Sequence, residues 1–136
     1  MKIEFFKGDA VDQHVEWIEK QLGTSNDRLA PNEGFQPFVF LLQINEEKAG
    51  GIVAFKSWDW LVIDSIVLME PYRNTAYGKL LLEKAEAYGR SIGCKRAKLE
   101  TFQAEAFYRK FGYETHAVLH DYPPGFSFAT MVKLFD

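Results

Sequence analysis

The first part of the chain combines a short aromatic segment with a helical repeat of apolar residues. Residues 3–6, Ile-Glu-Phe-Phe, predict a short first strand. A helix is predicted from Asp9, which can cap it, to Gly23, which can end it. Residues 24–36 are rich in Ser, Asn, Asp, Pro and Gly and predict a loop. The apolar residues of the helix recur at the spacing of one face: Val11, Val15, Ile18 and Leu22.

The middle of the chain changes to runs that are typical of strands. Residues 38–44 and 50–56 are separated by a polar turn and predict a hairpin. Residues 61–69 form a denser apolar run that only Asp64 and Ser65 interrupt. Such a run is typical of a central strand that is covered on both faces.

The second half begins with an amphipathic helix at 79–92, which Gly93 can end. Its predicted apolar stripe consists of Leu81, Ala85, Tyr88 and Ile92. Its predicted polar face consists of Lys79, Glu83, Glu86 and Arg90. The remaining predicted elements are a strand at 97–101, a helix at 104–111 and a closing hairpin of strands at 114–120 and 127–135.

This order of elements predicts a mixed α/β (α+β) fold, in which hairpins flank a strand–helix–strand unit. The chain of 136 residues, 47% apolar and 15% aromatic, is large enough to bury a core without disulfides or metals. We therefore expect one domain spanning residues 1–136.

Composition narrows the partners and the compartment. The net charge of −3 and the dispersed Lys and Arg argue against a nucleic-acid partner and are compatible with a cationic substrate. Cys94 is the only cysteine, and we expect it to be a small apolar core residue. The histidines lack metal-ligand spacing, so no metal is expected. Without a signal peptide or a membrane-length apolar run, the sequence predicts a soluble cytoplasmic protein.

One turn points to a ligand. Residues 73–82 connect the dense apolar run to the amphipathic helix and begin Arg-Asn-Thr-Ala-Tyr-Gly. Small residues that open a helix leave N–H groups free, and these groups favour phosphate or pyrophosphate. Arg73 can add a forked cationic contact. Taken alone, the pattern is also compatible with ordinary turn chemistry.

Three short motifs follow one another along the second half of the chain. The first is residues 73–78; the second is residues 104–114, Ala-Glu-Ala-Phe-Tyr-Arg-Lys-Phe-Gly-Tyr-Glu. The third is residues 121–125, Asp-Tyr-Pro-Pro-Gly, leading to residues 131–134. Together they resemble the acetyl-CoA signature, the Ala-x-x-Phe-Tyr-x-Lys-x-Gly-Phe/Tyr segment and the closing hairpin of the GCN5-related N-acetyltransferase (GNAT) family. The resemblance covers nearly the whole chain.

The resemblance implies a mostly antiparallel central sheet flanked by helices, with two parallel strands that splay apart at the acetyl-CoA site. It makes acetyl-CoA the cosubstrate. Tyr108 matches the family's general acid, which protonates the sulfur of coenzyme A. The residues expected to contact acetyl-CoA are Ile66, Val67, Leu68, Arg73, Asn74, Thr75, Ala76, Tyr77, Gly78, Lys79, Gln103 and Phe107.

The general base is open to more than one interpretation. Asp64 shares the strand alternation of Ile66 and Leu68, which predicts that its carboxylate faces the same side. Glu100 on the neighbouring strand is the other candidate, and deprotonation through ordered water is a third.

The chain departs from the family pattern at two places. Ala76 occupies the position of the first signature glycine, which would narrow the approach of the backbone to the pyrophosphate if a positive φ were required there. Thr101-Phe102-Gln103 occupies the stretch where many relatives carry Asn, and Thr101 or Gln103 can replace the amide contact.

The function implied is an N-acetyltransferase that acts on the amine of a small molecule or peptide by direct attack in a ternary complex. The alternative is a catalytically silent module that binds acetyl-CoA as a sensor. Dimerisation is common in the family, so a homodimer is compatible with the resemblance, although no surface in the sequence identifies an interface.

Overall fold

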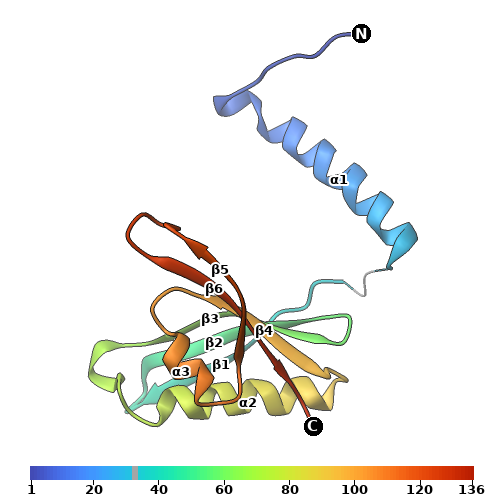
Figure 1. Ribbon diagram of the computed structural model, residues 1–136. Coiled ribbons are helices and arrows are strands. Elements are labelled where there is room, and N and C mark those ends of the chain that lie inside the picture. Colours follow the sequence, from blue (N-terminus) through green and yellow to red (C-terminus); the bar gives the residue numbers. More distant parts are fainter. Residues whose placement is uncertain (32–33) are drawn as a thin grey trace. The chain divides into compact units, whose positions relative to one another are not determined.

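The computed structural model describes residues 1–31 and 34–136 and divides the chain into two compact units (Figure 1). The first unit comprises residues 1–33 and the second comprises residues 34–136. A single domain spanning residues 1–136 stays a prediction.

The first unit is built around one long helix. α1 (Asp12–Leu29) follows a single 3-10 turn, η1 (Gly8–Ala10). The predicted strand at residues 3–6 is wrong, because these residues have no regular structure and pair with none of the six strands that the described residues form. An extended segment without a neighbouring strand gains no ladder hydrogen bonds, so its aromatic character alone does not make it a strand.

The predicted helix stop at Gly23 is also wrong. α1 continues through Gly23 to Leu29, so residues 24–29 of the predicted loop are helical, and residues 32–33 of that loop lie outside the described residues. Gly23 lacks the positive φ that a helix-ending glycine adopts. The hydroxyl of Thr24 donates to the carbonyl of Lys20 at 3.0 Å, which satisfies this polar side chain within the helix. The helix ends two residues before Pro31, which cannot continue it.

The second unit is a six-stranded sheet in the order β1-β2-β3-β4-β6-β5. β3 and β4 run parallel and every other neighbouring pair is antiparallel, which confirms the predicted fold class. The strands are β1 (Phe38–Ile44), β2 (Glu47–Ser57), β3 (Trp60–Leu68), β4 (Arg96–Thr101), β5 (Glu114–His120) and β6 (Ser127–Leu134).

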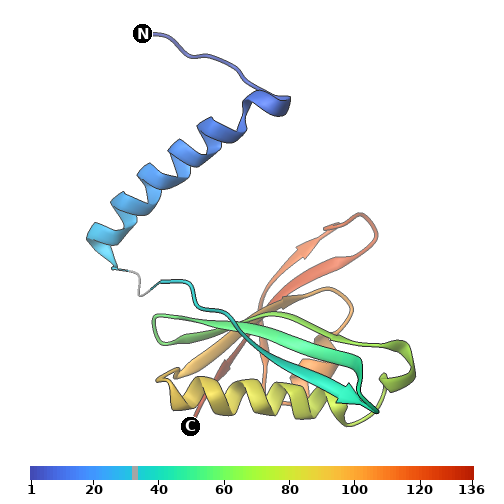
Figure 2. The same cartoon turned by 180° about the vertical axis from the view of Figure 1, so that it is seen from behind.

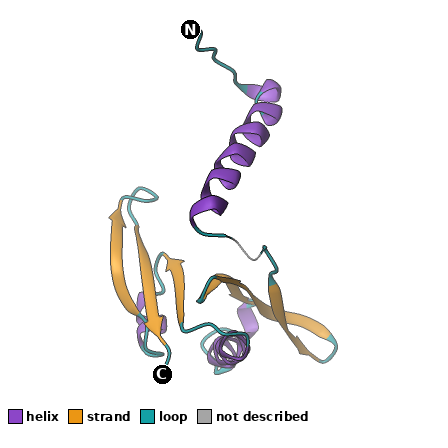
Figure 3. Cartoon of the chain, turned by 90° about the vertical axis from the view of Figure 1, so that its right-hand side faces the viewer, coloured by secondary structure: helices purple, strands orange, loops and turns teal. Residues whose placement is uncertain are grey.

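The helices of the second unit follow the predicted order. η2 (Glu70–Tyr72) is a 3-10 turn after β3, α2 (Tyr77–Ser91) lies against one face of β1–β3, and α3 (Glu105–Arg109) is a short helix before β5 (Figures 1 and 2). Figure 3 shows α2 nearly end-on beneath the strands. The core lies between α2 and this sheet face. Its fully buried large side chains are Ile52, Leu61, Leu82, Tyr113 and Met131.

Cys94 belongs to this core, as predicted. It is 5% exposed, and burial raises the pKa of its thiol. It therefore behaves as a small apolar residue that packs at the end of α2.

The ladder between β2 and β3 contains a bulge at Asp64. Val53 pairs with Ser65 and Ala54 pairs with Ile63, so Asp64 has no partner of its own. The extra residue reverses the alternation of the strand. The β3 residues that lie in the core or pack against it are Leu61, Ile63, Ile66 and Leu68. Alternation across the bulge no longer determines the face of Asp64, which is exposed, so its predicted direction stays a prediction.

Within residues 34–136, β3 is covered on only one of its two faces. Val67 is 57% exposed, whereas Leu61 is fully buried. The prediction of a strand covered on both faces therefore does not hold within residues 34–136. A bulge shifts the positions that face the core by one residue. A strand with one covered face can therefore have a nearly continuous apolar sequence.

The predicted polar face of α2 contains one error with structural consequences. Glu86 is buried, with only 7% of its surface exposed. Its carboxylate accepts a hydrogen bond from the hydroxyl of Tyr113 at 2.8 Å and pairs with the ammonium of Lys133 at 2.7 Å. Tyr88, predicted in the apolar stripe, is instead 43% exposed and packs edge-on against Phe38. The Glu86 contacts tie α2 to β6 and to the segment that follows α3.

Glu86→Ala should lower the free energy of unfolding by about 2–4 kcal/mol, because it leaves the Tyr113 hydroxyl and the Lys133 ammonium without their shared acceptor. Glu83→Ala, on the same helix but with an exposed ion pair to Lys79, should change it by less than about 0.5 kcal/mol. Urea unfolding of both variants measures the difference. Equal losses would show that the buried contacts contribute no more than the surface pair.

Candidate active site

The parallel strands β3 and β4 separate beyond the bulge. Their ladder begins at Trp60–Arg96 and ends at Ile63–Leu99. Beyond that pair, β3 is paired only with β2, and the end of β4 is paired only with β6. The edge of β3 that faces β4 therefore has backbone groups without a strand partner, and the predicted splay of the two strands is present.

Two cavities open at this split. The larger, about 760 Å³, extends from β3 to the N-terminus of α2 and to α3. The smaller, about 240 Å³, lies between the separating ends of β3 and β4. They share two lining residues, Ile66 and Tyr108. The two cavities thus adjoin at the end of the split strands.

Ten of the predicted acetyl-CoA contacts line the larger cavity: Ile66, Val67, Leu68, Arg73, Asn74, Thr75, Ala76, Gly78, Lys79 and Phe107. Their role in binding stays a prediction. Tyr77 and Gln103 do not line it: the Tyr77 ring packs against Tyr72, and Gln103 occupies a turn with a φ of 78°. Sequence reasoning missed the lining residues Ala104, Lys110 and Phe111, although all three lie within the second motif.

The start of α2 has the geometry of an anion site. The first helical bond runs from the N–H of Leu80 to the carbonyl of Ala76, and the N–H of Tyr77 bonds to the hydroxyl of Thr75. Within the described residues, the N–H groups of Gly78 and Lys79 have no acceptor. These groups lie at the positive end of a helix of 15 residues and at the wall of the larger cavity.

The two small positions of the signature have different structural roles. Ala76 has φ −74° and ψ −3°, which alanine adopts without strain, so the missing glycine imposes no backbone cost here. At Gly78, an added Cβ would lie 3.0 Å from the Phe107 ring. Glycine at 78 therefore permits close packing between the helix start and α3.

Arg73 ties the turn to the strand. Its Nε donates to the carbonyl of Leu68 at 2.9 Å, which fixes the guanidinium next to the open edge of β3. The other two guanidinium nitrogens have no acceptor in residues 1–31 or 34–136 and remain available to an anion. Lys79 and Lys110 add positive charge to the same cavity, which no Asp or Glu lines among the described residues.

Tyr108 is the polar group that both cavities share. Its side chain packs against the rings of Phe107 and Tyr113, and the residue is 6% exposed. The hydroxyl makes no hydrogen bond in the part of the chain that the structure describes, and its oxygen is accessible rather than buried. Burial raises the pKa of Tyr108 to about 12, so the phenol stays protonated at neutral pH and can donate a proton.

Both candidate bases line the smaller cavity. Asp64 projects from the bulge of β3, and Glu100 lies on β4. Asp64 accepts one hydrogen bond, at 3.4 Å, from the hydroxyl of Ser65. The bulge therefore places Asp64 at the split even though it reverses the alternation used to predict its direction.

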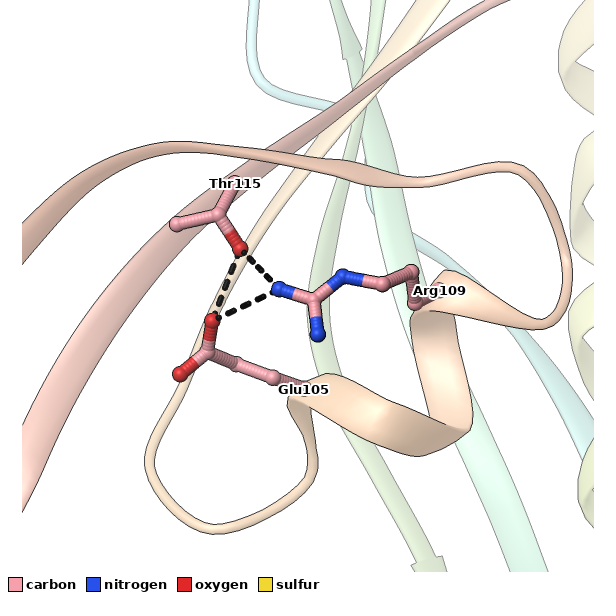
Figure 4. Close-up of polar contacts among 3 residues, drawn as sticks. All are labelled: Glu105, Arg109 and Thr115. Atoms are coloured by element: carbon pink, nitrogen blue, oxygen red, sulfur yellow. Dashed lines mark hydrogen bonds and ion pairs between the residues drawn. The ribbon is translucent and has the colours of Figure 1, made fainter.

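A polar cluster that sequence reasoning missed holds α3 in place. Glu105 accepts hydrogen bonds from Thr115 at 2.7 Å and from Arg109 at 3.3 Å, and Arg109 also donates to Thr115 at 3.0 Å (Figure 4). The ion pair between Glu105 and Arg109 could have been predicted from their spacing of four residues on one helix. The contact to Thr115 could not, because it depends on where β5 packs. The cluster fixes the helix that carries Tyr108.

Known proteins share both the sequence pattern and the fold. The profile of the Acetyltransferase (GNAT) family matches residues 4–113. Blasticidin-S acetyltransferase of Streptomyces morookaense is 39% identical over 90 residues, which cover 64% of this chain and 66% of that protein. The chain thus spans slightly less than two thirds of this curated relative's length.

Solved structures agree on the fold. An acetyltransferase from Bacillus cereus ATCC 14579 superimposes with a TM-score of 0.89 at 24% identity, over 98% of each chain. A Bacillus anthracis protein solved in complex with acetyl coenzyme A gives a TM-score of 0.66 at 19% identity, over 76% of this chain and 65% of that chain. From the family match, the chain belongs to the acetyltransferase (GNAT) family.

None of the helices in residues 1–31 and 34–136 combines the length and apolar character needed to cross a membrane. No group of three or more His, Cys, Asp and Glu side chains there is arranged to hold a metal ion.

The raised pKa of Tyr108 predicts a pH effect on stability. In the unfolded chain the phenol ionises near its ordinary pKa of 10.0, whereas in the fold it ionises at about 12. Stability is therefore full below pH 10 and falls as the pH rises from about 10 towards about 12. Across that window wild type should lose up to about 1.4 kcal/mol per pH unit more than Tyr108→Phe.

Urea unfolding at a series of pH values above 9 measures these slopes. Tyr88→Phe removes an exposed tyrosine and should keep the wild-type slope. Identical slopes for wild type and Tyr108→Phe would refute the raised pKa.

Proposed function

We propose that the chain is an acetyl-CoA-dependent N-acetyltransferase of the cytoplasm that acetylates the amine of a small molecule by direct attack in a ternary complex. The observation that carries the proposal is the meeting of two cavities at Tyr108 and Ile66. Direct attack requires two substrates bound at once with their reacting groups adjacent.

The larger cavity suits the donor. The free N–H groups of Gly78 and Lys79 and the guanidinium of Arg73 fit a pyrophosphate, and the apolar wall of Ile66 and Leu68 fits an extended chain. The open edge of β3 offers backbone groups to such a chain, in the manner of an added strand. Acetyl-CoA bound there would supply the acetyl group as a reactive thioester.

The residues at the junction can move the two protons that the reaction requires. An aliphatic ammonium has a pKa of about 10, so the acceptor must lose a proton before it attacks. Asp64 at the bulge is our choice of base, acting directly or through water, because it lies two residues before the shared Ile66. Tyr108, protonated and buried at the junction, then donates to the departing thiolate.

A covalent route through cysteine has no support. Cys94 is the only cysteine of the chain, and it lines neither of the two cavities. The small-molecule acceptor is supported by the relative whose name specifies blasticidin S as its substrate.

Tyr108→Phe should lower kcat by about 10²-fold while changing the Kd for acetyl-CoA by less than about threefold, because the proton donor is lost and the ring is kept. Release of free thiol from acetyl-CoA in the presence of an amine library measures kcat, and calorimetry measures Kd. Tyr88→Phe, outside both cavities, should leave both unchanged. Thiol release that is absent for wild type with every amine would leave the silent binding module as the better interpretation.

Reversing the charge of Arg73, just before α2, should weaken the binding of coenzyme A. Arg73→Glu should weaken coenzyme A at least about tenfold, because it replaces a pyrophosphate donor with a like charge. Lys84→Glu, an equal charge change on the exposed side of α2, should have less than about a threefold effect. Ala76→Gly should not tighten binding, since the backbone at 76 is already unstrained. Titration calorimetry measures all three, and equal losses in the two charge variants would contradict the pyrophosphate assignment.

A further inference from the structure

The two adjoining cavities have opposite charge. Arg73, Lys79 and Lys110 line the larger one. Asp64 and Glu100 line the smaller one, and among the described residues no Lys or Arg does. Lys98, two residues before Glu100 on β4, is not part of the lining. The change of sign occurs across Tyr108 and Ile66.

The carboxylates of the smaller cavity are largely uncommitted. Asp64 accepts one long hydrogen bond from Ser65, and Glu100 has no hydrogen bond or ion pair within the described residues. Both side chains are exposed and line the cavity without a cationic partner, so the negative charge of the cavity favours a cationic ligand.

A second observation independently points to a ligand. Tyr108 is 6% exposed and lines the same cavity, its hydroxyl makes no hydrogen bond within the described residues, and the hydroxyl oxygen is accessible rather than buried. A largely buried side chain whose one polar atom is accessible and has no protein partner can bond to a molecule in the cavity.

The remaining walls limit the size and shape of the occupant. Phe102 and Phe128 supply aromatic surface, and Leu99 and Ile63 supply aliphatic surface. Aromatic faces attract cations and also pack against methylene groups. At about 240 Å³, the cavity suits a short aliphatic or ring stem with a charged end rather than a folded chain.

We infer that the smaller cavity is a subsite for a second cationic group of the acceptor, so that the protein selects small amines that carry at least two positive charges. The inference rests on the proposed N-acetyltransferase function and specifies its substrate class. Asp64, at the bulge two residues before the shared Ile66, serves the reacting amine, and Glu100 on the opposite wall holds the second cation. An acceptor that carries a carboxylate in place of that cation is repelled.

Length-matched acceptors test the inference. With acetyl-CoA, wild type should show a kcat/KM for 1,5-diaminopentane at least about tenfold above that for pentylamine, and 6-aminohexanoate should be poorer than pentylamine. Glu100→Gln should remove most of the preference for the diamine over pentylamine. Glu47→Gln, an exposed carboxylate on β2 outside the cavity, should keep the full preference.

A binding experiment separates this inference from the proposed reaction. Calorimetry of 1,5-diaminopentane and pentylamine against the protein saturated with coenzyme A should show tighter diamine binding that depends on Glu100. Thiol release that fails for every amine, with Glu100-dependent diamine binding retained, would overturn the reaction and support the subsite. Equal treatment of diamine and monoamine by wild type, or an unchanged preference in Glu100→Gln, would overturn the subsite.

Discussion

The end of the β3–β4 ladder at Ile63 and Leu99 is the constraint on which the rest of the site depends. Up to that pair, the two parallel strands satisfy each other's backbone groups, and beyond it each has a partner on one side only. The bulge at Asp64 coincides with the point of separation and increases the local bend of the strand. If β3 and β4 continued to pair beyond this point, their hydrogen bonds would close the gap in which the two cavities lie. The site exists because the sheet is interrupted.

The surrounding contacts hold that interruption open. Arg73 fixes the turn before α2 to the end of β3, and Glu86 fixes α2 to β6 and to Tyr113. The cluster of Glu105, Arg109 and Thr115 fixes α3 to β5. These contacts bind together elements on both sides of the split, so the cavity walls are held by polar contacts where ladder bonds are missing. A preformed space of this kind reduces the ordering that a ligand must otherwise impose.

The sequence was informative where the structure follows local patterns. β1 and β5 have the predicted bounds, and the turn at 73–78 with its neighbouring motif led to the residues that line the larger cavity. The errors occurred where distant parts of the chain decide the outcome. Residues 3–6 lacked a partner strand, and Glu86 became buried because Tyr113 and Lys133 satisfy it.

Asp64 illustrates both the reach and the limit of such reasoning. Its charge inside an apolar run indicated an unusual position, but strict alternation does not determine its direction, because a bulge cannot be predicted from one strand alone. The position of Glu100 was equally hard to predict, because Glu100 lines the smaller cavity only where β3 stops pairing with β4. Family membership accounts for the helix start through a contiguous motif, whereas single residues of separate strands line much of the smaller cavity. If the proposed function holds, selectivity for the acceptor can therefore diverge through changes at Asp64, Glu100 or their aromatic neighbours without disturbing the helix start.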